Sequence, residues 1–170
     1  MTRSTSAKVA IVVFEDLQCP DCRRAHPLLK EAAKTYKIPI VHYDFPLPQH
    51  KWAQPAAVYG RYFDSKSKDL GGAYRDYIYE NQPQITPENL TTYVQKFAAA
   101  QKTRLPFVVD PKGELANKVN DDRNLGQRIG IKHTPTIYVV SNRAQGEPFV
   151  EVVDRSKLFE LIQTMLKEAK

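Results

Sequence analysis

The sequence has no apolar run long enough to cross a membrane. Its longest run, Val9 to Phe14, is far shorter than the roughly 20 residues that a membrane helix needs. Basic runs of about five to eight residues are missing too, and the tightest cluster is Arg23–Arg24. We therefore interpret the net charge of +6 as a solvated basic surface, and expect neither membrane insertion nor a nucleic-acid partner.

A secretory leader is also not visible. Such a leader needs an apolar stretch of about 7–15 residues followed by small residues. Here Val9–Phe14 is too short and runs directly into Glu15 and Asp16. The sequence predicts either a cytoplasmic protein or a mature chain whose leader has been removed.

Internal repeats, low-complexity segments and heptads are absent, as are nucleotide, haem-attachment and calcium loops. The composition, 42% hydrophobic and 26% charged, is close to that of an average globular domain. The length of 170 residues suits a single domain. We expect a monomer that needs no cofactor.

Cysteine is scarce: the chain has only Cys19 and Cys22, in the sequence Cys-Pro-Asp-Cys. A disulfide across so small a loop removes little chain entropy, so a purely stabilising role is a poor explanation. A structural zinc ion needs four ligands, and although His26 follows Cys22 by four residues, the other histidines are isolated. No metal is expected, and a redox dithiol remains as the third interpretation. A lone Cys-x-x-Cys is only moderately specific, so its context must decide.

The first part of the chain predicts a strand, a helix and a second strand. Val9–Phe14 is a β-branched apolar run typical of a strand buried on both faces. A helical pattern starts at Pro20 and contains Pro27, which should kink it. Ile38–Phe45 resembles an edge strand because it contains Pro39 and polar alternation. Together they predict a βαβ unit with a right-handed crossover.

The last part predicts a hairpin followed by a helix. Thr136–Val140 and Phe149–Val153 have strand composition, and the turn Ser141–Glu147 separates them. Asp154 or Ser156 can then cap a final amphipathic helix.

The middle of the chain is mostly helical. Helical patterns cover 51–63, 73–80, 86 to about 100, and 115–129, whereas 105–109 is a short apolar loop or strand. Thr86 and Pro87 predict a helix start, but Asn89 rather than Glu follows, so a full capping box is absent. We interpret Trp52 and the tyrosines as core packing of a helical subdomain rather than as a binding platform.

Three segments in this order resemble the DsbA-like thiol-disulfide oxidoreductases of the thioredoxin superfamily: Phe14–Cys22, Phe45–His50 and Gly130–Thr136. The resemblance implies an α/β, thioredoxin-like fold with a mixed four-stranded sheet, built from βαβ and then ββα. It implies one domain over 1–170, in which 7–45 and 131–170 form the thioredoxin core and 46–130 an inserted helical subdomain.

The chemistry of exchange assigns roles to the Cys-Pro-Asp-Cys residues. Cys19 at the start of a helix should have a lowered pKa and act as the nucleophile, with Cys22 as the resolving thiol. Pro20 suits the first helical turn, and Asp21 is a tuning residue. The resemblance further implies that the Thr134–Pro135 bond is cis and that this loop binds the client.

The sequence departs from the family in two places. Val13 stands where many thioredoxin-fold enzymes have a buried carboxylate, which makes Glu15 or Asp16 a substitute proton relay, although a cap or turn role is as good an explanation. Pro-Asp also replaces the Pro-His of the strong oxidants. A carboxylate near the thiolate should raise its pKa, so we expect a milder oxidant unless Asp21 faces solvent.

The sequence thus predicts an enzyme that exchanges disulfides with cysteine-containing proteins and is recycled by a redox partner protein. A disulfide-introducing oxidase in the periplasm or another extracytoplasmic compartment is favoured, because disulfides persist there. A reductase or isomerase on the same scaffold is the alternative. A non-catalytic module that binds a metal or a peptide is a third.

Overall fold

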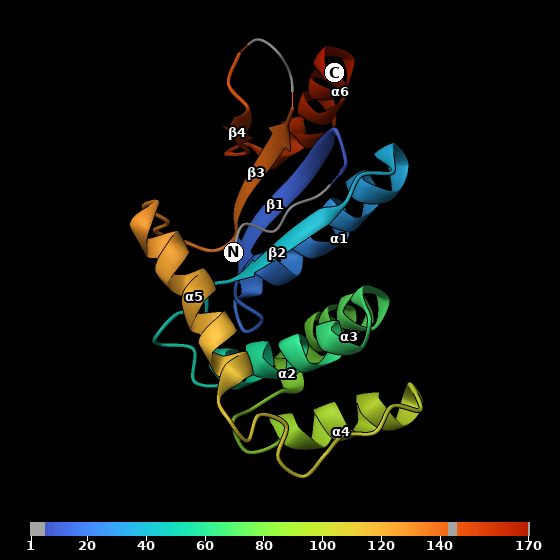
Figure 1. Ribbon diagram of the computed structural model, residues 1–170, viewed down its shortest axis with the longest axis vertical. Helices are drawn as coiled ribbons and strands as arrows, with labels where there is room; N and C mark the ends of the chain where they lie inside the picture. Colours follow the sequence, from blue (N-terminus) through green and yellow to red (C-terminus); the bar gives the residue numbers. More distant parts are fainter. Residues whose placement is uncertain (1–5, 143–145, 170) are drawn as a thin grey trace.

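The computed structural model describes residues 6–142 and 146–169, and its core is one mixed four-stranded sheet. The strand order is β2-β1-β3-β4, so β2 is an edge strand, as its sequence predicted. β1 pairs in parallel with β2 and antiparallel with β3, and β3 pairs antiparallel with β4. This confirms the βαβ and ββα halves (Figure 1). The strands are β1 (Val9–Glu15), β2 (Ile40–Asp44), β3 (Thr136–Ser141) and β4 (Phe149–Glu151).

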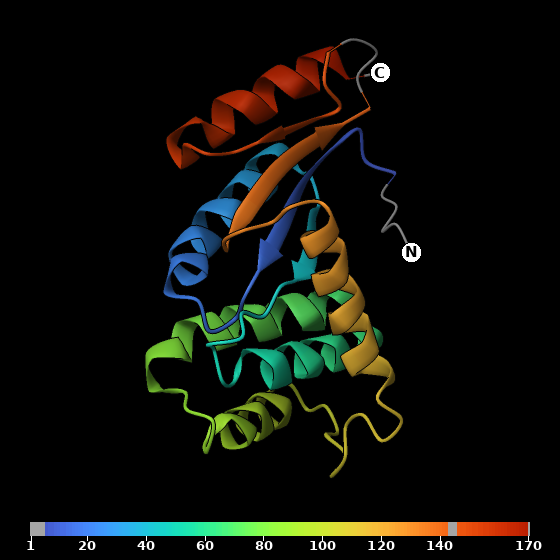
Figure 2. The ribbon, with the colours of Figure 1, turned by 90° about the vertical axis from the view of Figure 1, so that its left-hand side faces the viewer.

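The helices cover both faces of this sheet and one of its ends (Figure 2). α1 and α6 lie on one face, where Ile11, Val13 and Val139 are buried against Leu29 and Ile162. The helices are α1 (Pro20–Tyr36), α2 (Ala53–Lys66), α3 (Lys68–Asn81), α4 (Leu90–Ala100), α5 (Glu114–Arg128) and α6 (Leu158–Glu168), with short 3₁₀ turns η1 (Gln82–Gln84) and η2 (Arg155–Lys157).

α5 packs on the opposite face of the sheet. Phe14 stacks on Tyr43 there, with ring centroids 4.9 Å apart, and Phe45 meets Phe14 edge-on. Gly126 lets α5 approach these rings, because a Cβ atom at this position would lie 2.6 Å from Phe45. The missing side chain therefore sets how closely α5 lies against the sheet.

The helices inserted between β2 and β3 have a core of their own. Trp52, Phe63, Tyr74, Ile78 and Phe97 are buried together, and three of their rings meet at centroid distances of 4.9 to 5.6 Å. The interpretation of these aromatic residues as core packing is confirmed. The same cluster includes Cys19 and Cys22, which places the dithiol at the junction between sheet and insertion.

Buried ion pairs tie the insertion to the sheet. Arg61 of α2 pairs with Asp44 of β2 at 2.5 Å and with Asp122 of α5. Arg75 of α3 lies 3.3 Å from Glu15 of β1 and 2.8 Å from Asp64. Removing one member would leave a buried charge uncompensated, which typically costs about 3–5 kcal/mol. Since α5 contacts both β2 and α2, the division at 45/46 and 130/131 stays an interpretation.

Several expected boundaries move. α4 begins at Leu90 rather than at Thr86. The Asn89 amide donates to the Thr86 hydroxyl at 3.3 Å, and the Thr86 amide donates to the Asn89 side chain at 2.7 Å. Asn89 thus makes the reciprocal bond that a capping box takes from Glu or Gln. Residues 105–109 form no strand. β3 runs on to Ser141, β4 stops at Glu151, and residues 143–145 of the expected turn lie outside the described part. Asp154 accepts a hydrogen bond from the Ser156 amide, 3.0 Å away, and so caps η2, which leads into α6.

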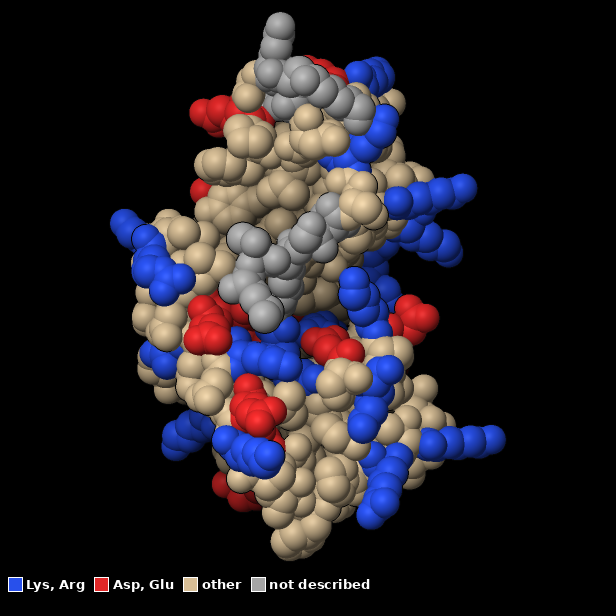
Figure 3. Space-filling view, viewed as in Figure 1, with Lys and Arg blue, Asp and Glu red and all other residues tan. Residues whose placement is uncertain are grey.

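Charge is spread over the surface. On the face shown in Figure 3, lysine and arginine side chains surround acidic ones rather than forming one basic stripe. Within the described residues, every helix is too short or too polar to span a bilayer.

Candidate active site

Cys19 and Cys22 lie where β1 passes into α1. Cys19 is the N-cap residue of α1, with φ −72° and ψ 122°, and Pro20 occupies the first helical position, where no N–H is needed. The Cys19 amide donates to the carbonyl of Asp16 over 3.0 Å, which closes the turn between strand and helix. Both cysteines are free thiols; Cys19 is 7% exposed and Cys22, one turn further along, 3%.

The loop before β3 closes over Cys19. The Thr134–Pro135 bond is cis, which confirms the expectation from the family resemblance. The Cys19 sulfur lies 3.5 Å from the Thr134 carbonyl oxygen, to which its protonated form donates, although 115 residues separate them in sequence. The buried Thr134 hydroxyl has no partner of normal hydrogen-bond geometry among the described residues, so a turn of its O–H lets it donate to a thiolate at Cys19.

The two thiols have opposite acidities. A hydrogen bond from Cys22, together with bonds from Thr134 and from the backbone amides of Cys22 and Asp21, lowers the pKa of Cys19 to about 5 despite burial. Burial, and then its bond to Cys19, raise the pKa of Cys22 well above its ordinary value. Cys19 is therefore thiolate at neutral pH while Cys22 keeps its proton.

Glu15 is a buried anion below the dithiol. Burial alone would raise its pKa, but the nearby His42, bonded at 2.7 Å, and Arg75 outweigh burial and lower it to about 2. Tyr79 also donates to Glu15, at 3.0 Å. Because this carboxylate stays ionised at neutral pH, it holds α3 to β1 and cannot exchange protons there.

Asp16 differs from Glu15 in acidity. Burial raises its pKa, although the amides of Leu47 and Gln18 and the ring of His50 all donate to it at 2.7 Å. The His50 side chain is 20% exposed, so this pair connects the interior with solvent. The backbone N–H of Asp16 donates to the Cys22 sulfur at 3.4 Å.

The comparisons with known proteins match this geometry. A family model described as thioredoxin covers residues 4–169. The chain belongs to the thioredoxin family.

Three further matches place it near DsbA proteins. It is 28% identical over 148 residues to the probable disulfide bond formation protein D of Bacillus cereus, covering 81% of this chain and 68% of that protein. The crystal structure of Wolbachia pipientis alpha-DsbA1 has a TM-score of 0.76 at 16% identity, over 96% of this chain and 88% of that one. BdbD from Bacillus subtilis gives 0.75 at 20% identity, over 97% and 89%. The resemblance to a DsbA-like fold is therefore confirmed.

In this thioredoxin-family chain, two polar residues that no sequence motif indicates bind the turn that carries Cys19 and Cys22. Gln82 of η1 donates to the carbonyls of Leu17 and Cys19 at 2.8 and 3.1 Å. Arg155 of η2 donates to both carboxylate oxygens of Asp21. Neither residue belongs to a motif, and both reach the turn only through the fold.

Two of the four histidines, His26 and His133, lie outside the turn that carries the cysteines. His26 pairs with Asp76 of α3 at 2.6 Å, and His133 has an exposed side chain. Within the described residues, no group of three or more His, Cys, Asp or Glu side chains is arranged to hold a metal ion.

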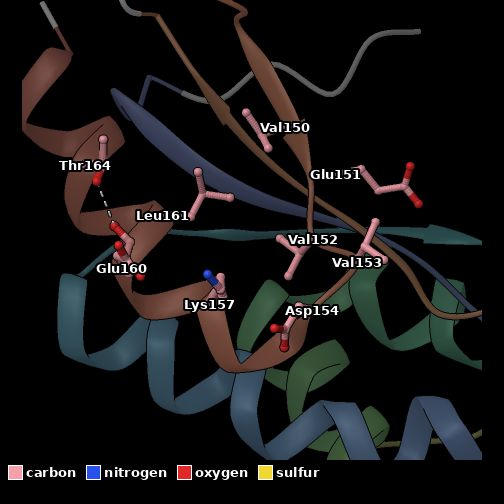
Figure 4. A pocket seen from close by; sticks show the side chains of 9 residues that line it. All are labelled: Val150, Glu151, Val152, Val153, Asp154, Lys157, Glu160, Leu161 and Thr164. Atoms are coloured by element: carbon pink, nitrogen blue, oxygen red, sulfur yellow. Dashed lines mark hydrogen bonds between the residues drawn. The ribbon is translucent and has the colours of Figure 1, made fainter.

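Two hollows formed by the described residues lie away from the dithiol. One, of about 370 Å³, lies between β4 and α6, where Val150, Leu161 and Thr164 line it (Figure 4). Another, of about 400 Å³, lies on the face of the sheet that α5 covers and is lined by Val12, Tyr138 and other apolar residues. Both sulfurs are buried, and neither hollow is lined by a cysteine.

Proposed function

We propose that this thiol-disulfide oxidoreductase acts on protein clients, with Cys19 forming the mixed disulfide and Cys22 as its intramolecular partner. The observation that carries the proposal is the difference in acidity. Exchange requires a thiolate as attacking or leaving group, and only Cys19 is stabilised as one.

In the oxidising direction, a client thiolate attacks the Cys19 sulfur of the Cys19–Cys22 disulfide. The client–Cys19 bond forms, the bond to Cys22 breaks, and Cys22 leaves with the electron pair and takes up a proton. A second client thiolate then attacks the client sulfur of the mixed disulfide, and Cys19 leaves as a thiolate. The client has lost two electrons, and the dithiol has gained them.

The acidity pattern favours this direction. A stable Cys19 thiolate is a good leaving group and stabilises the reduced enzyme, which makes the disulfide form oxidising. We therefore propose a disulfide-introducing oxidase in an extracytoplasmic, oxidising compartment, recycled by a redox partner protein. Asp21 has its charge paired with Arg155, so the milder potential expected from Pro-Asp depends on that pair.

The loop at Thr134 and Pro135 is proposed as the client-binding edge. The Thr134 backbone faces Cys19, so an extended client segment could pair with it while its own cysteine meets the Cys19 sulfur.

Asp16, rather than Glu15, is proposed to carry the proton for Cys22. It has a raised pKa, lies beside Cys22 through its backbone, and reaches solvent through His50. Glu15 serves the structure, because its carboxylate remains ionised at neutral pH.

The test compares Cys19→Ser and Cys22→Ser in exchange with a scrambled ribonuclease, whose non-native disulfides supply the bond that the attacking thiolate breaks. We expect Cys19→Ser to lose exchange completely, and Cys22→Ser to accumulate a mixed disulfide with the client through Cys19. A Cys19→Ser variant with full exchange activity would overturn the proposal. Equilibrium with glutathione decides the direction: a potential near −120 mV fits an oxidase and one near −270 mV the alternative reductase.

A further inference from the structure

Arg155 reaches the dithiol turn from the other half of the fold. Its Nη2 atom lies 2.7 and 2.9 Å from the two carboxylate oxygens of Asp21, and its Nη1 atom lies 3.5 Å from the Asp21 carbonyl oxygen. One guanidinium group thus binds both the side chain and the backbone of Asp21, one of the two residues between the cysteines. Charge-assisted bonds of this kind are about twice as strong as neutral ones.

The fold places Arg155 there rigidly. The preceding residue, Asp154, caps η2 and lines the hollow between β4 and α6 (Figure 4), while the following helix is anchored by the fully buried Leu158. Arg24 also contacts Asp21, at 3.2 Å, but its side chain is 69% exposed against 34% for Arg155. Arg24 is therefore the weaker partner and a natural control.

Asp21 acts on Cys19 in two opposing ways. Its backbone amide is among the donors that lower the pKa of Cys19. Its carboxylate, in the same helical turn, would disfavour a thiolate if it came close. The hydrogen bond from Arg155 is the main reason that the pKa of Asp21 is lowered, so this carboxylate is ionised wherever the enzyme works.

Other charged groups around Cys19 are engaged elsewhere or face away. Glu15 and Asp16, which end β1 and begin the turn, are bonded to His42 and His50. Lys132 and His133, before the cis proline, have exposed side chains. Asp21 is thus the nearby anion that arginines alone hold in place, and chiefly Arg155.

We propose that Arg155 is a positioning residue for the exchange reaction, which holds the Asp21 carboxylate and so prevents it from approaching the Cys19 thiolate. Without Arg155 the carboxylate can rotate toward the sulfur. The thiolate then becomes less stable, the reduced form is disfavoured, and the enzyme becomes a weaker oxidant. This inference rests on the proposed role of Cys19.

The experiment is a double-mutant cycle of Arg155→Gln and Asp21→Asn, read by thiolate absorbance of Cys19 against pH and by equilibrium with glutathione. We expect Arg155→Gln to raise the pKa of Cys19 by about one unit, the lower end of what a nearby charge produces. The glutathione equilibrium should move about tenfold toward the disulfide form, which equals about 30 mV. In the Asp21→Asn background the same substitution should move the pKa by less than half as much.

If the guanidinium charge of Arg155 acted directly on Cys19 without holding Asp21, removing it would change the pKa of Cys19 by the same amount with and without the Asp21 carboxylate. Equal shifts with and without the Asp21 carboxylate, or no shift at all, would overturn the inference. Arg24→Gln should leave the pKa of Cys19 nearly unchanged. Arg155→Lys keeps the positive charge, so the pKa of Cys19 in that variant should lie closer to the wild-type value than in Arg155→Gln. If Arg155→Gln has no effect while Cys19→Ser still abolishes exchange, only this inference fails and the proposed function stands.

Discussion

Replacing Glu15 by glutamine should destabilise the protein at neutral pH and much less in acid. The pKa of Glu15 falls from 4.5 to about 2 in the folded protein. At 1.36 kcal/mol for each unit, this corresponds to about 3 kcal/mol of stability. Because the folded pKa is the lower one, the contribution is complete above pH 4.5 and is lost as the pH falls toward 2.

The assay is urea unfolding of the wild type and Glu15→Gln at several pH values between about 6 and 2. The difference in the free energy of unfolding should shrink by about 3 kcal/mol across this range. Glu31→Gln, at an exposed position on α1, is the control for loss of a surface carboxylate. If the Glu15→Gln difference were the same at both ends of the range, the assignment of Glu15 as a stabilised buried anion would be wrong.

Three further predictions concern packing and the dithiol. Gly126→Ala should lower the free energy of unfolding by about 1–2 kcal/mol, because overpacking against Phe45 exceeds the gain in helix propensity. Gly72→Ala is the control, since a Cβ there meets nothing within 4 Å and should not destabilise the protein. Thermal unfolding checks both. Thr134→Val should raise the pKa of Cys19 in absorbance titration, because a hydroxyl donor is lost; an unchanged pKa would contradict this. Asp21→His should lower that pKa, and a titration showing no decrease would refute the tuning role.

The sequence was sufficient for the parts of the fold that local chemistry controls. The β-branched run from Val9 to Phe14 predicted a strand buried on both faces, and Pro20 after Cys19 predicted the start of a helix. Both follow from short-range patterns, namely apolar runs and capping chemistry. The cis bond before Pro135 came only from the family resemblance, because a Thr-Pro pair alone says little about its isomer.

The polar contacts that tune the site could not be predicted in the same way. Arg155 and Asp21 are 134 residues apart, and Gln82 and Cys19 are 63 apart. No periodicity records such a pair, because its existence depends on how the two halves of the sheet and the insertion pack. For Glu15 a signal was present: an acidic residue at the end of a buried strand needs a partner, although nothing local named His42.

The contact between Cys19 and Thr134 has a consequence for how the protein is made. Synthesis proceeds from the N-terminus, so both cysteines leave the ribosome before the residues that close over them exist. Until Thr134 has been added and the last strands have joined the sheet, Cys19 lacks one of the hydrogen bonds that lower its pKa. The full acidity of the reactive sulfur is thus reached late in folding, because a chain that ends before Thr134 lacks this donor.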